Sequence, residues 1–208
     1  MTNVLIIDSA ATGQASVSRR LTAELEVILR GRGPVRIVHR DVGSNPVPHL
    51  SAETTAAIRG AEAETEAARD AVALSDELIA ELKSADLIVI GSPMYNFGMP
   101  STLKAWFDHV LRAGITFRYS EAGPEGLVKG KKAIIVESRA GLYSSGPSAP
   151  MDSQEPHLRT LLSFMGVDDV TFVRAEKLAF GPDSAAASIA EAIDQLRSLA
   201  AEELPLAA

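Results

Sequence analysis

Short apolar segments recur along the chain at wide spacing, at residues 4–7, 35–38, 87–90, 133–136 and 170–173. Stretches with helical periodicity lie between them, and this alternation predicts a parallel β-sheet covered by helices on both faces. The first and third segments are continuous runs of Val, Ile and Leu, as expected for central strands that are buried on both faces. The second segment is interrupted by Arg36, which indicates an edge strand. We therefore expect an α/β fold with five parallel strands.

Helical periodicity is clearest after the third segment. Pro100 favours the start of this helix and Gly114 its end. The residues that share its apolar face are Leu103, Trp106, Phe107, Val110 and Leu111.

Three further helices are predicted, one from near Ser18, one over residues 69–84 and one over residues 184–203. Residues 42–66 are predicted to form a loop and a short exposed helix. No internal repeat, low-complexity linker or domain boundary divides the sequence, so we expect a single domain over residues 1–208.

Ligands of open parallel sheets bind at the carboxyl ends of the strands, which makes the loops after strands one, three and four the candidates. The first of these loops, residues 8–18, is rich in Ser and Thr and leads into a helix. Hydroxyls beside a helix N-terminus suit a phosphate, such as the terminal phosphate of FMN. The loop has neither the Lys of a Walker motif nor a GxGxxG pattern. The alternative is that Ser16 or Ser18 only caps the helix.

The loop after the third strand carries unusually large side chains: Met94, Tyr95, Asn96 and Phe97. A flavin ring is a flat, mostly apolar plate with polar edges, and such side chains can form a shelf for it. The alternative is that the aromatic residues only cover the core. The fourth strand ends in a loop of small residues, 137–147, which lets the backbone approach a ligand closely. Within it, Arg139 either lies at the ligand or is a solvated surface charge.

Composition narrows the range of functions. The 208 residues are 46% hydrophobic and 23% charged, and the net charge is −7. The absence of cysteine excludes disulfides and thiolate chemistry. No metal site is expected because the four histidines have no ligand spacing, and His109 is expected at the surface or an interface. Neither nucleic acid nor a membrane is an expected partner, since there is no basic stripe and no apolar run of about 18 residues. No secretory signal is visible, so a cytoplasmic location is expected.

The stretch "SPMYNFGMPSTLKAWFDHVLRAGITFRYSEAGPEGLVKGKKAIIVESRAG", residues 92–141, resembles the core signature of the FMN-dependent NADH azoreductases, which are also NADH:quinone oxidoreductases. The likeness runs from "VLIIDSA" to "GVDDVTFVRAE" and covers nearly the whole chain. It implies a flavodoxin-like three-layer sandwich with the strand order 2-1-3-4-5. It also implies a homodimer with one FMN per subunit at the interface. The reaction implied is ping-pong: NADH reduces FMN and leaves, and a quinone or azo compound is then reduced.

The resemblance also implies roles for individual residues. The phosphate would be held by Ser16, Val17 and Ser18, with Ser9 and Ala10 nearby; the ring would be lined by Met94, Tyr95, Asn96 and Phe97 and closed on its other side by Ser138, Arg139, Ala140 and Gly141. Tyr119 matches an aromatic residue that reaches the substrate cavity, that of the partner subunit. Two positions depart from the family pattern, because Ala10 replaces a second serine and Ala140 replaces the first glycine of a Gly-Gly pair.

Two other functions compete with the enzyme. One is a flavodoxin-like carrier that binds FMN and passes single electrons to proteins without NADH activity. The other is a flavodoxin-like scaffold that has lost its cofactor. The large side chains of residues 94–97 and the Tyr119 segment favour the enzyme. No side chain is expected to act as a nucleophile, because the flavin itself carries the redox chemistry. Tyr119 is a candidate substrate contact, and the proton could come from it or from water.

Overall fold

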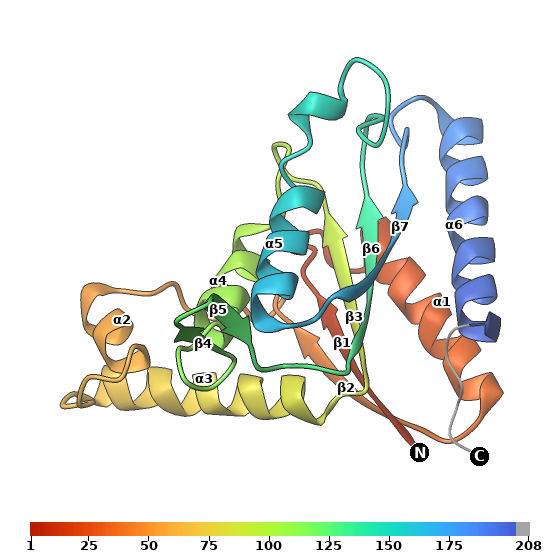
Figure 1. The fold of residues 1–208 in the computed structure, drawn as a ribbon. Coiled ribbons are helices and arrows are strands. Elements are labelled where there is room, and N and C mark those ends of the chain that lie inside the picture. The colour runs from red at the N-terminus through yellow and green to blue at the C-terminus, as the bar shows by residue number, and fades with distance from the viewer. Residues whose placement is uncertain (203–208) are drawn as a thin grey trace.

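The computed structural model describes residues 1–202 and places a five-stranded parallel sheet at the centre of the molecule (Figure 1). The strand order is β2-β1-β3-β6-β7, which is the predicted order 2-1-3-4-5 once a separate two-stranded hairpin, β4-β5, is set aside. The strands are β1 (Thr2–Asp8), β2 (Val35–Asp41), β3 (Leu87–Pro93), β6 (Lys132–Ser138) and β7 (Asp169–Ala175). The predictions of a central first and third strand and of an edge second strand are confirmed.

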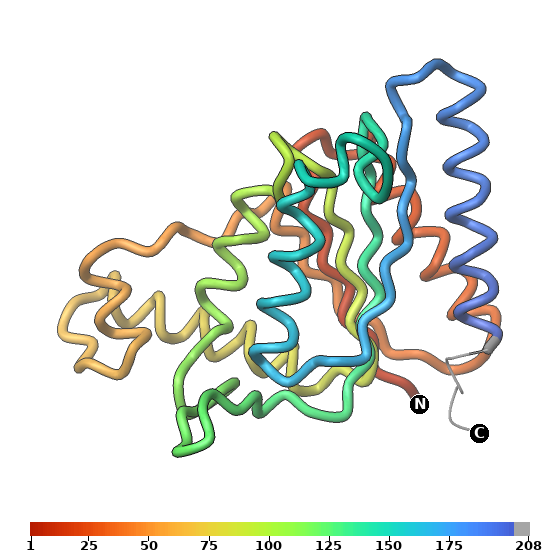
Figure 2. The backbone as a smooth tube through the Cα atoms, turned by 45° about the horizontal axis from the view of Figure 1, so that its top comes forward, coloured from red at the N-terminus to blue at the C-terminus, as the bar shows by residue number. Residues whose placement is uncertain are grey.

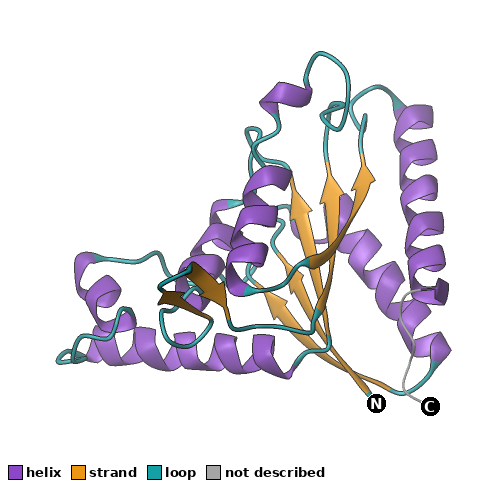
Figure 3. Ribbon diagram, in the orientation of Figure 1, coloured by secondary structure: helices purple, strands orange, loops and turns teal. Residues whose placement is uncertain are grey.

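The register aligns the carboxyl ends of the strands at one edge of the sheet. Asp8 pairs with both Asp41 and Gly91, while Ser138 pairs with Pro93 and with the last residue of β7. The loops that leave β1, β3 and β6 consequently emerge beside one another, beyond the arrowheads in Figure 3.

Successive residues of the central strands point to opposite faces, and each face has its own set of helices (Figure 2). Val4 and Ile6 pack against α1 (Val17–Arg32) and α6 (Pro182–Glu202). Leu5 and Ile7 belong to the other cluster, with α3 (Glu66–Ser84), α4 (Ser101–Val110) and α5 (Glu155–Met165). The last residue predicted for the final helix, 203, lies outside the described residues, as does the rest of the single domain predicted to extend to 208.

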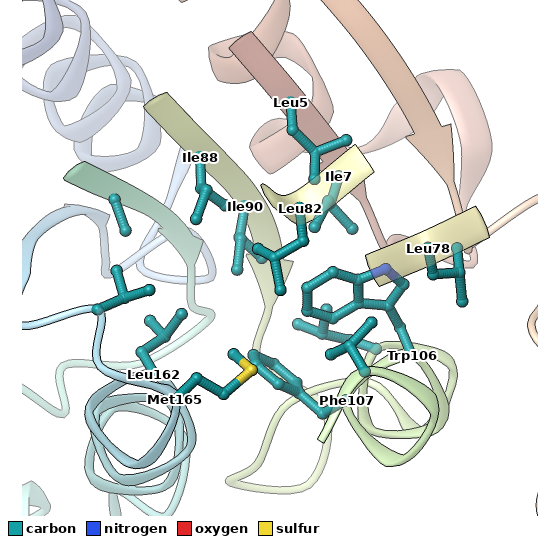
Figure 4. Packing of buried hydrophobic residues seen from close by; sticks show 14 of the residues in the cluster. Leu5, Ile7, Leu78, Leu82, Ile88, Ile90, Trp106, Phe107, Leu162 and Met165 are labelled. Atoms are coloured by element: carbon teal, nitrogen blue, oxygen red, sulfur yellow. The ribbon is translucent and has the colours of Figure 1, made fainter. Parts of the chain in front are cut away.

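The face that carries α4 has an aromatic core (Figure 4). Trp106 and Phe107 are fully buried, and their rings meet edge to face with centroids 4.9 Å apart. Truncating a side chain of this kind costs about 3–5 kcal/mol, because the cavity it leaves does not close. The helix ends at Val110, four residues before Gly114, the end that the sequence predicted. Just after Val110, the Arg112 N–H donates to Thr116 Oγ1 at 2.9 Å instead of continuing the helix.

Two helices begin where a hydroxyl caps them. The Thr65 hydroxyl accepts from the Ala68 N–H at 3.2 Å, so α3 begins at residue 66 and not at the predicted residue 69. A capping box between Ser51 and Thr54 starts α2 (Ala52–Ile58), the short helix predicted within residues 42–66. No helix within residues 1–202 is long and apolar enough to cross a membrane.

The structure contains elements that the sequence pattern did not reveal. These are α5 and the hairpin of β4 (Phe117–Ser120) and β5 (Gly123–Gly126). The hairpin sits against the end of α5, where a Cβ on Gly126 would come within 2.1 Å of the Gly166 backbone nitrogen.

The prediction that His109 lies at the surface or an interface is wrong. Its side chain is 1% exposed, and Nε2 lies 3.0 Å from the Pro48 carbonyl oxygen. Burial lowers the pKa of the imidazole. His109 therefore links the segment between β2 and α2 to α4. Its position on the predicted helix indicated exposure, because helical spacing does not show that this segment covers it.

Candidate functional site

Hydrogen bonds join the three loops predicted to bind a ligand. The Ala11 N–H, after β1, donates to Tyr95 Oη at 3.1 Å, and the Met94 N–H, after β3, donates to the Ser138 carbonyl at 2.9 Å. The Ser153 N–H also donates to the Phe97 carbonyl at 3.0 Å. The structure thus brings together residues 9–18, 94–97 and 138–141 at one edge of the sheet.

The start of the first loop is buried. The Ser9 hydroxyl donates to the Gly91 carbonyl at 2.7 Å, and Ser9 and Ala10 are each 1% exposed. The Ala10 backbone lies so close to Gly43 that a Cβ there would be 2.3 Å from the Ala10 carbonyl oxygen. These two residues anchor the loop, and their side chains do not face an open surface.

A cradle for an anion follows at the start of α1. Ser16 is the N-cap, and its Oγ accepts from the Arg19 N–H at 3.3 Å. The hydroxyls of Ser16 and Ser18 lie 3.0 Å apart, so one hydroxyl hydrogen joins them and the other remains to be donated. The N–H groups of the first turn, including that of Val17, have no acceptor within the helix. Capping and anion binding are therefore compatible at Ser16.

Beneath the cradle lies an ion network that the sequence analysis missed. Arg19 donates from both terminal nitrogens to Asp41, each at 2.8 Å, and this pairing lowers the pKa of Asp41 to about 2. Asp8 accepts from the Thr22 hydroxyl at 2.8 Å, and burial raises the pKa of Asp8. The network ties the first turn of α1 to the ends of β1 and β2. Because Arg19 is already neutralised, the anion site depends on hydroxyls and N–H groups.

The loop after β3 is a tight turn with a strained backbone. Tyr95 and Gly98 exchange two backbone hydrogen bonds, of 2.9 and 3.1 Å. The two residues between them have positive φ, 48° at Asn96 and 71° at Phe97. Positive φ at both central positions defines a type I′ turn, where Asn is favoured and Gly usually follows. A phenylalanine in that conformation costs on the order of 1–3 kcal/mol, which marks this turn as a functional candidate.

Large side chains of this strained turn point outward. Phe97 is 40% exposed, and its ring meets that of Tyr143 edge to face at 6.0 Å between centroids. Met94 and Tyr95 are half-buried and Asn96 is exposed. The aromatic residues of this loop therefore do not simply cover the core; they form an accessible, mostly apolar surface between the other two loops.

The loop after β6 is built on a buried cation. The alternative of a solvated Arg139 is wrong, because its side chain is fully buried. Nη2 lies 2.7 Å from Glu137 Oε2 and 3.0 Å from Asp152 Oδ2, and Nη1 lies 3.3 Å from Glu176 Oε1. The guanidinium thus points into the protein and is not available to a ligand. The sequence analysis missed all three acidic partners.

The backbone of this loop accommodates Ala140, the residue that departs from the family pattern. Ala140 is exposed and is not among the residues with positive φ, so its Cβ meets no strain. Gly141 is different, since a Cβ there would be 2.9 Å from the Tyr143 ring. Ser138 is buried at the end of β6 and offers its carbonyl to Met94.

Tyr119 lies apart from these loops within one chain. It is 74% exposed on β4 and touches Phe117 edge to face at 5.7 Å. Figure 1 draws the hairpin below the carboxyl ends of the strands, and its strand β5 contacts α5. A role for Tyr119 at the loops of its own chain is therefore not supported by this arrangement.

Comparisons with known proteins agree with the fold. A family model described as "Flavodoxin-like fold" matches residues 2–200. The FMN-dependent NADH:quinone oxidoreductase of Hyphomonas neptunium is 53% identical over 203 residues, 96% of this chain and 96% of that protein. The protein of the same name from Azotobacter vinelandii is 46% identical, covering 96% of this chain and all of its own length.

Solved structures give the same answer. An azoreductase from Bacillus anthracis superposes with a TM-score of 0.86 at 28% identity, covering 96% of this chain and 99% of its own. A second structure, an FMN-dependent NADH-azoreductase from Bacillus anthracis in complex with FMN, has a TM-score of 0.87 at 24% identity and supports the fold. With its sheet order, its three joined loops and relatives this similar over almost their whole length, the chain belongs to the flavodoxin-like family of FMN-dependent NADH:quinone oxidoreductases.

Proposed function

We propose that this chain is an FMN-dependent oxidoreductase that takes electrons from NADH and passes them, two at a time, to quinones and azo compounds in a ping-pong reaction. The observation that carries the proposal is the joining of an anion cradle at the start of α1 to a strained aromatic turn, through the Ala11 to Tyr95 hydrogen bond. The names of the relatives indicate the same activity.

The residues present fit FMN. The cradle of Ser16, Val17 and Ser18 offers hydroxyls, first-turn N–H groups and the positive end of the α1 dipole to a terminal phosphate. Residues 94–97 and 138–141 offer apolar side chains and backbone polar groups to a flat ring. Ser9 and Ala10 would support the cradle from beneath, through their backbone. Bound FMN supplies the transfer of electron pairs between NADH and the acceptor.

The remaining contributions come from the chain itself. Met94, Tyr95 and Phe97 exclude water from the ring face, which strengthens polar contacts at its rim. Asn96, held with φ 48° at the tip of the turn, carries an amide that can donate to a ring edge. No side chain is required as a nucleophile, and the proposal assigns no metal.

We further propose that the working unit is a cytoplasmic homodimer of single-domain, three-layer subunits. Tyr119 is 74% exposed and distant from the loops of its own chain, so it reaches a substrate only if it belongs to the partner's site. Helices packed on both faces of the sheet fit the three-layer arrangement.

Titration with FMN tests the cradle. Apo-protein is mixed with FMN and quenching of flavin fluorescence is followed for the wild type, Ser16→Ala and Ser51→Ala. Both serines cap helices, Ser16 for α1 and Ser51 for α2, so each loss destabilises the fold by about 1 kcal/mol. Only Ser16→Ala should weaken FMN binding, by about tenfold. Equal FMN affinities in the two variants would show that the cradle does not bind FMN.

Steady-state kinetics test the reaction. Rates with NADH and a simple quinone should give parallel double-reciprocal lines, as expected for ping-pong transfer. A quinone consumes one NADH, whereas cleavage of an azo bond to two amines takes four electrons and consumes two. A protein that binds FMN but does not oxidise NADH would be an electron carrier, and one that binds no FMN would be a scaffold without cofactor.

A further inference from the structure

The buried cluster under the loop after β6 has more partners than a structural ion pair needs. Besides its three carboxylates, Arg139 donates from Nε to Gln154 Oε1 at 3.1 Å. Its backbone is fixed as well, since the Arg139 N–H donates to the Ala175 carbonyl at 2.8 Å and its carbonyl accepts from the Leu178 N–H at 3.2 Å. Both the side chain and the backbone of Arg139, the first residue of the loop, are therefore fixed by hydrogen bonds.

Two partners of Arg139, Glu176 and Gln154, also hold other segments near the proposed flavin site. Glu176 Oε1 accepts from the N–H groups of Tyr143 and Ser144, at 2.9 and 3.0 Å, and the Ser144 hydroxyl also bonds Glu176. Gln154 donates from Nε2 to the backbone oxygen and the hydroxyl of Ser92, at 2.8 and 2.9 Å. The cluster therefore connects the loop after β6 to the end of β3, from which residues 94–97 emerge.

The charges in the cluster do not balance if every acid is ionised. One guanidinium faces Glu137, Asp152 and Glu176, while the nearby Arg174 is 3.7 Å from Glu137 and is held more closely by Glu155, at 2.6 Å. Glu137 is fully buried, and its Oε1 has no hydrogen-bond partner among the described residues. Burial, with Glu155 and Asp152 nearby, raises the pKa of Glu137 to about 8 against the opposing effect of Arg139.

We propose that Arg139 and Glu137 are positioning residues of the flavin site: Arg139 fixes residues 138–144 through its buried partners, and the charge on Glu137 sets how tightly that segment holds the cofactor. The inference rests on the proposed function.

The direction of the effect follows from the contacts. Neutral Glu137 leaves Arg139 Nη2 to Asp152, so the guanidinium bridges Asp152 and Glu176. Ionised Glu137 competes for the same nitrogen and adds a buried negative charge beneath the segment that contacts the ring of FMN, a ligand whose phosphate is itself negative. A surface cavity of about 410 Å³, bordered by Asp152, Glu155 and Arg174, lies beside the cluster, although Glu137 itself is fully buried. FMN binding should therefore weaken as the pH rises through 8.

The first test compares the wild type with Glu137→Gln, which keeps the shape of the neutral acid. The dissociation constant of FMN is measured by fluorescence quenching between pH 6.5 and 9.5. The wild type should bind about tenfold more weakly at the alkaline end, while the variant should lack this step. Titration of FMN itself is common to both proteins, so the difference between the two curves isolates Glu137. Parallel curves would overturn the role of Glu137, and so would a flat wild-type profile, whether or not the variant folds.

The second test separates positioning from general stability. Arg139→Lys keeps the charge but loses the planar fork that spans several partners, and it should weaken FMN binding by about tenfold or more. Arg40→Lys is the matched control, because Arg40 also bridges two carboxylates, Glu77 and Glu81, which both lie on α3. That control should keep wild-type affinity. If Arg139→Lys binds FMN like the wild type, the role of Arg139 is overturned; if the wild type binds no FMN, the proposed function fails instead.

Discussion

Two loops that face each other at the proposed site are held in opposite ways. The loop after β3 is a two-residue turn stabilised by backbone hydrogen bonds, with Asn96 and Phe97 in a left-handed conformation and their side chains exposed. The loop after β6 is fixed from within by Arg139, whose charge is fully buried. The loop after β3 has a strained backbone at the surface, whereas the loop after β6 has a buried charge in the interior.

This difference separates two demands on the site. A ring-binding surface must present large side chains in a fixed direction, and a tight turn with a strained residue does so with few atoms. A segment that contacts a ligand through its backbone needs its own side chains elsewhere, and the inward guanidinium of Arg139 achieves that. Substitutions should therefore have opposite effects on stability in the two loops, although both lower FMN affinity.

The largest effect is expected at the buried charge. Arg139→Met leaves Glu137, Asp152 and Glu176 without their cation, and the free energy of unfolding should fall by about 3–5 kcal/mol. Urea unfolding of the apo-protein at pH 7 measures it. Arg118→Met is the control, because that arginine is 60% exposed in its pair with Glu125 and should cost under about 1 kcal/mol. Similar losses in the two variants would contradict the account.

The buried carboxyl should make stability depend on pH. The pKa of Glu137 is about 8 in the folded protein against 4.5 ordinarily, so the folded state binds the extra proton between these values. Its contribution is complete below pH 4.5 and is lost as the pH rises through 8. Between pH 5 and 8 the wild type should lose about 3–4 kcal/mol more than Glu137→Gln. Urea unfolding at a series of pH values compares them, and identical slopes would show that Glu137 is not the titrating group.

The strained turn should respond in the opposite sense. Phe97→Gly removes a Cβ from a residue with φ 71°, so the stability of the apo-protein should be unchanged or rise by about 1 kcal/mol. FMN affinity should fall nevertheless, because the exposed ring is lost. Thermal unfolding and FMN titration of the same sample test both parts. A marked loss of stability would mean that the turn is not strained.

The link between the loops is weaker. Tyr95→Phe removes the acceptor of the Ala11 N–H and should cost about 0.5–1 kcal/mol, since water replaces part of the bond. Tyr143→Phe is the matched change on the other loop, and it should be neutral. Urea unfolding of both variants measures these changes. Equal losses of stability would show that the hydrogen bond between Ala11 and Tyr95 does not stabilise the fold.

The smallest effect on stability is expected outside both loops. Tyr119 is 74% exposed, so Tyr119→Phe should leave unfolding unchanged. Turnover with hydroxylated acceptors should fall if the partner's hydroxyl contacts the substrate. Measurement of kcat with such an acceptor and with one lacking hydroxyls tests this, and unchanged kinetics would exclude the tyrosine.

Much of the fold was predictable because apolar periodicity reports burial directly. The central positions of β1 and β3 and the edge position of β2 followed from it, whereas the full order of the sheet was implied by the family resemblance. The helix α5 was missed although Pro156 at its start, Gly166 at its end and Leu158 and Leu162 between them carry the usual signals. The hairpin β4-β5 was beyond the pattern, since its strands have four residues each and little apolar content.

The meeting of the three loops at one edge of the sheet was predictable, but the side-chain contacts that hold them were not. Loop composition indicated that residues 94–97 and 138–141 would meet at the ends of the strands. The inward direction of Arg139 was not readable, because its partners Asp152 and Glu176 lie far along the chain and meet it only after folding. Local composition likewise gave no sign that Ser9 would donate inward to Gly91 or that Phe97 would adopt a positive φ.

The central claim is that these loops hold an FMN that accepts electrons from NADH. Anaerobic mixing of FMN-loaded protein with NADH, followed by a simple quinone, tests it through the visible flavin spectrum. NADH should bleach the flavin in one two-electron step, and the quinone should restore the colour. A flavin that stays yellow with excess NADH would contradict the claim.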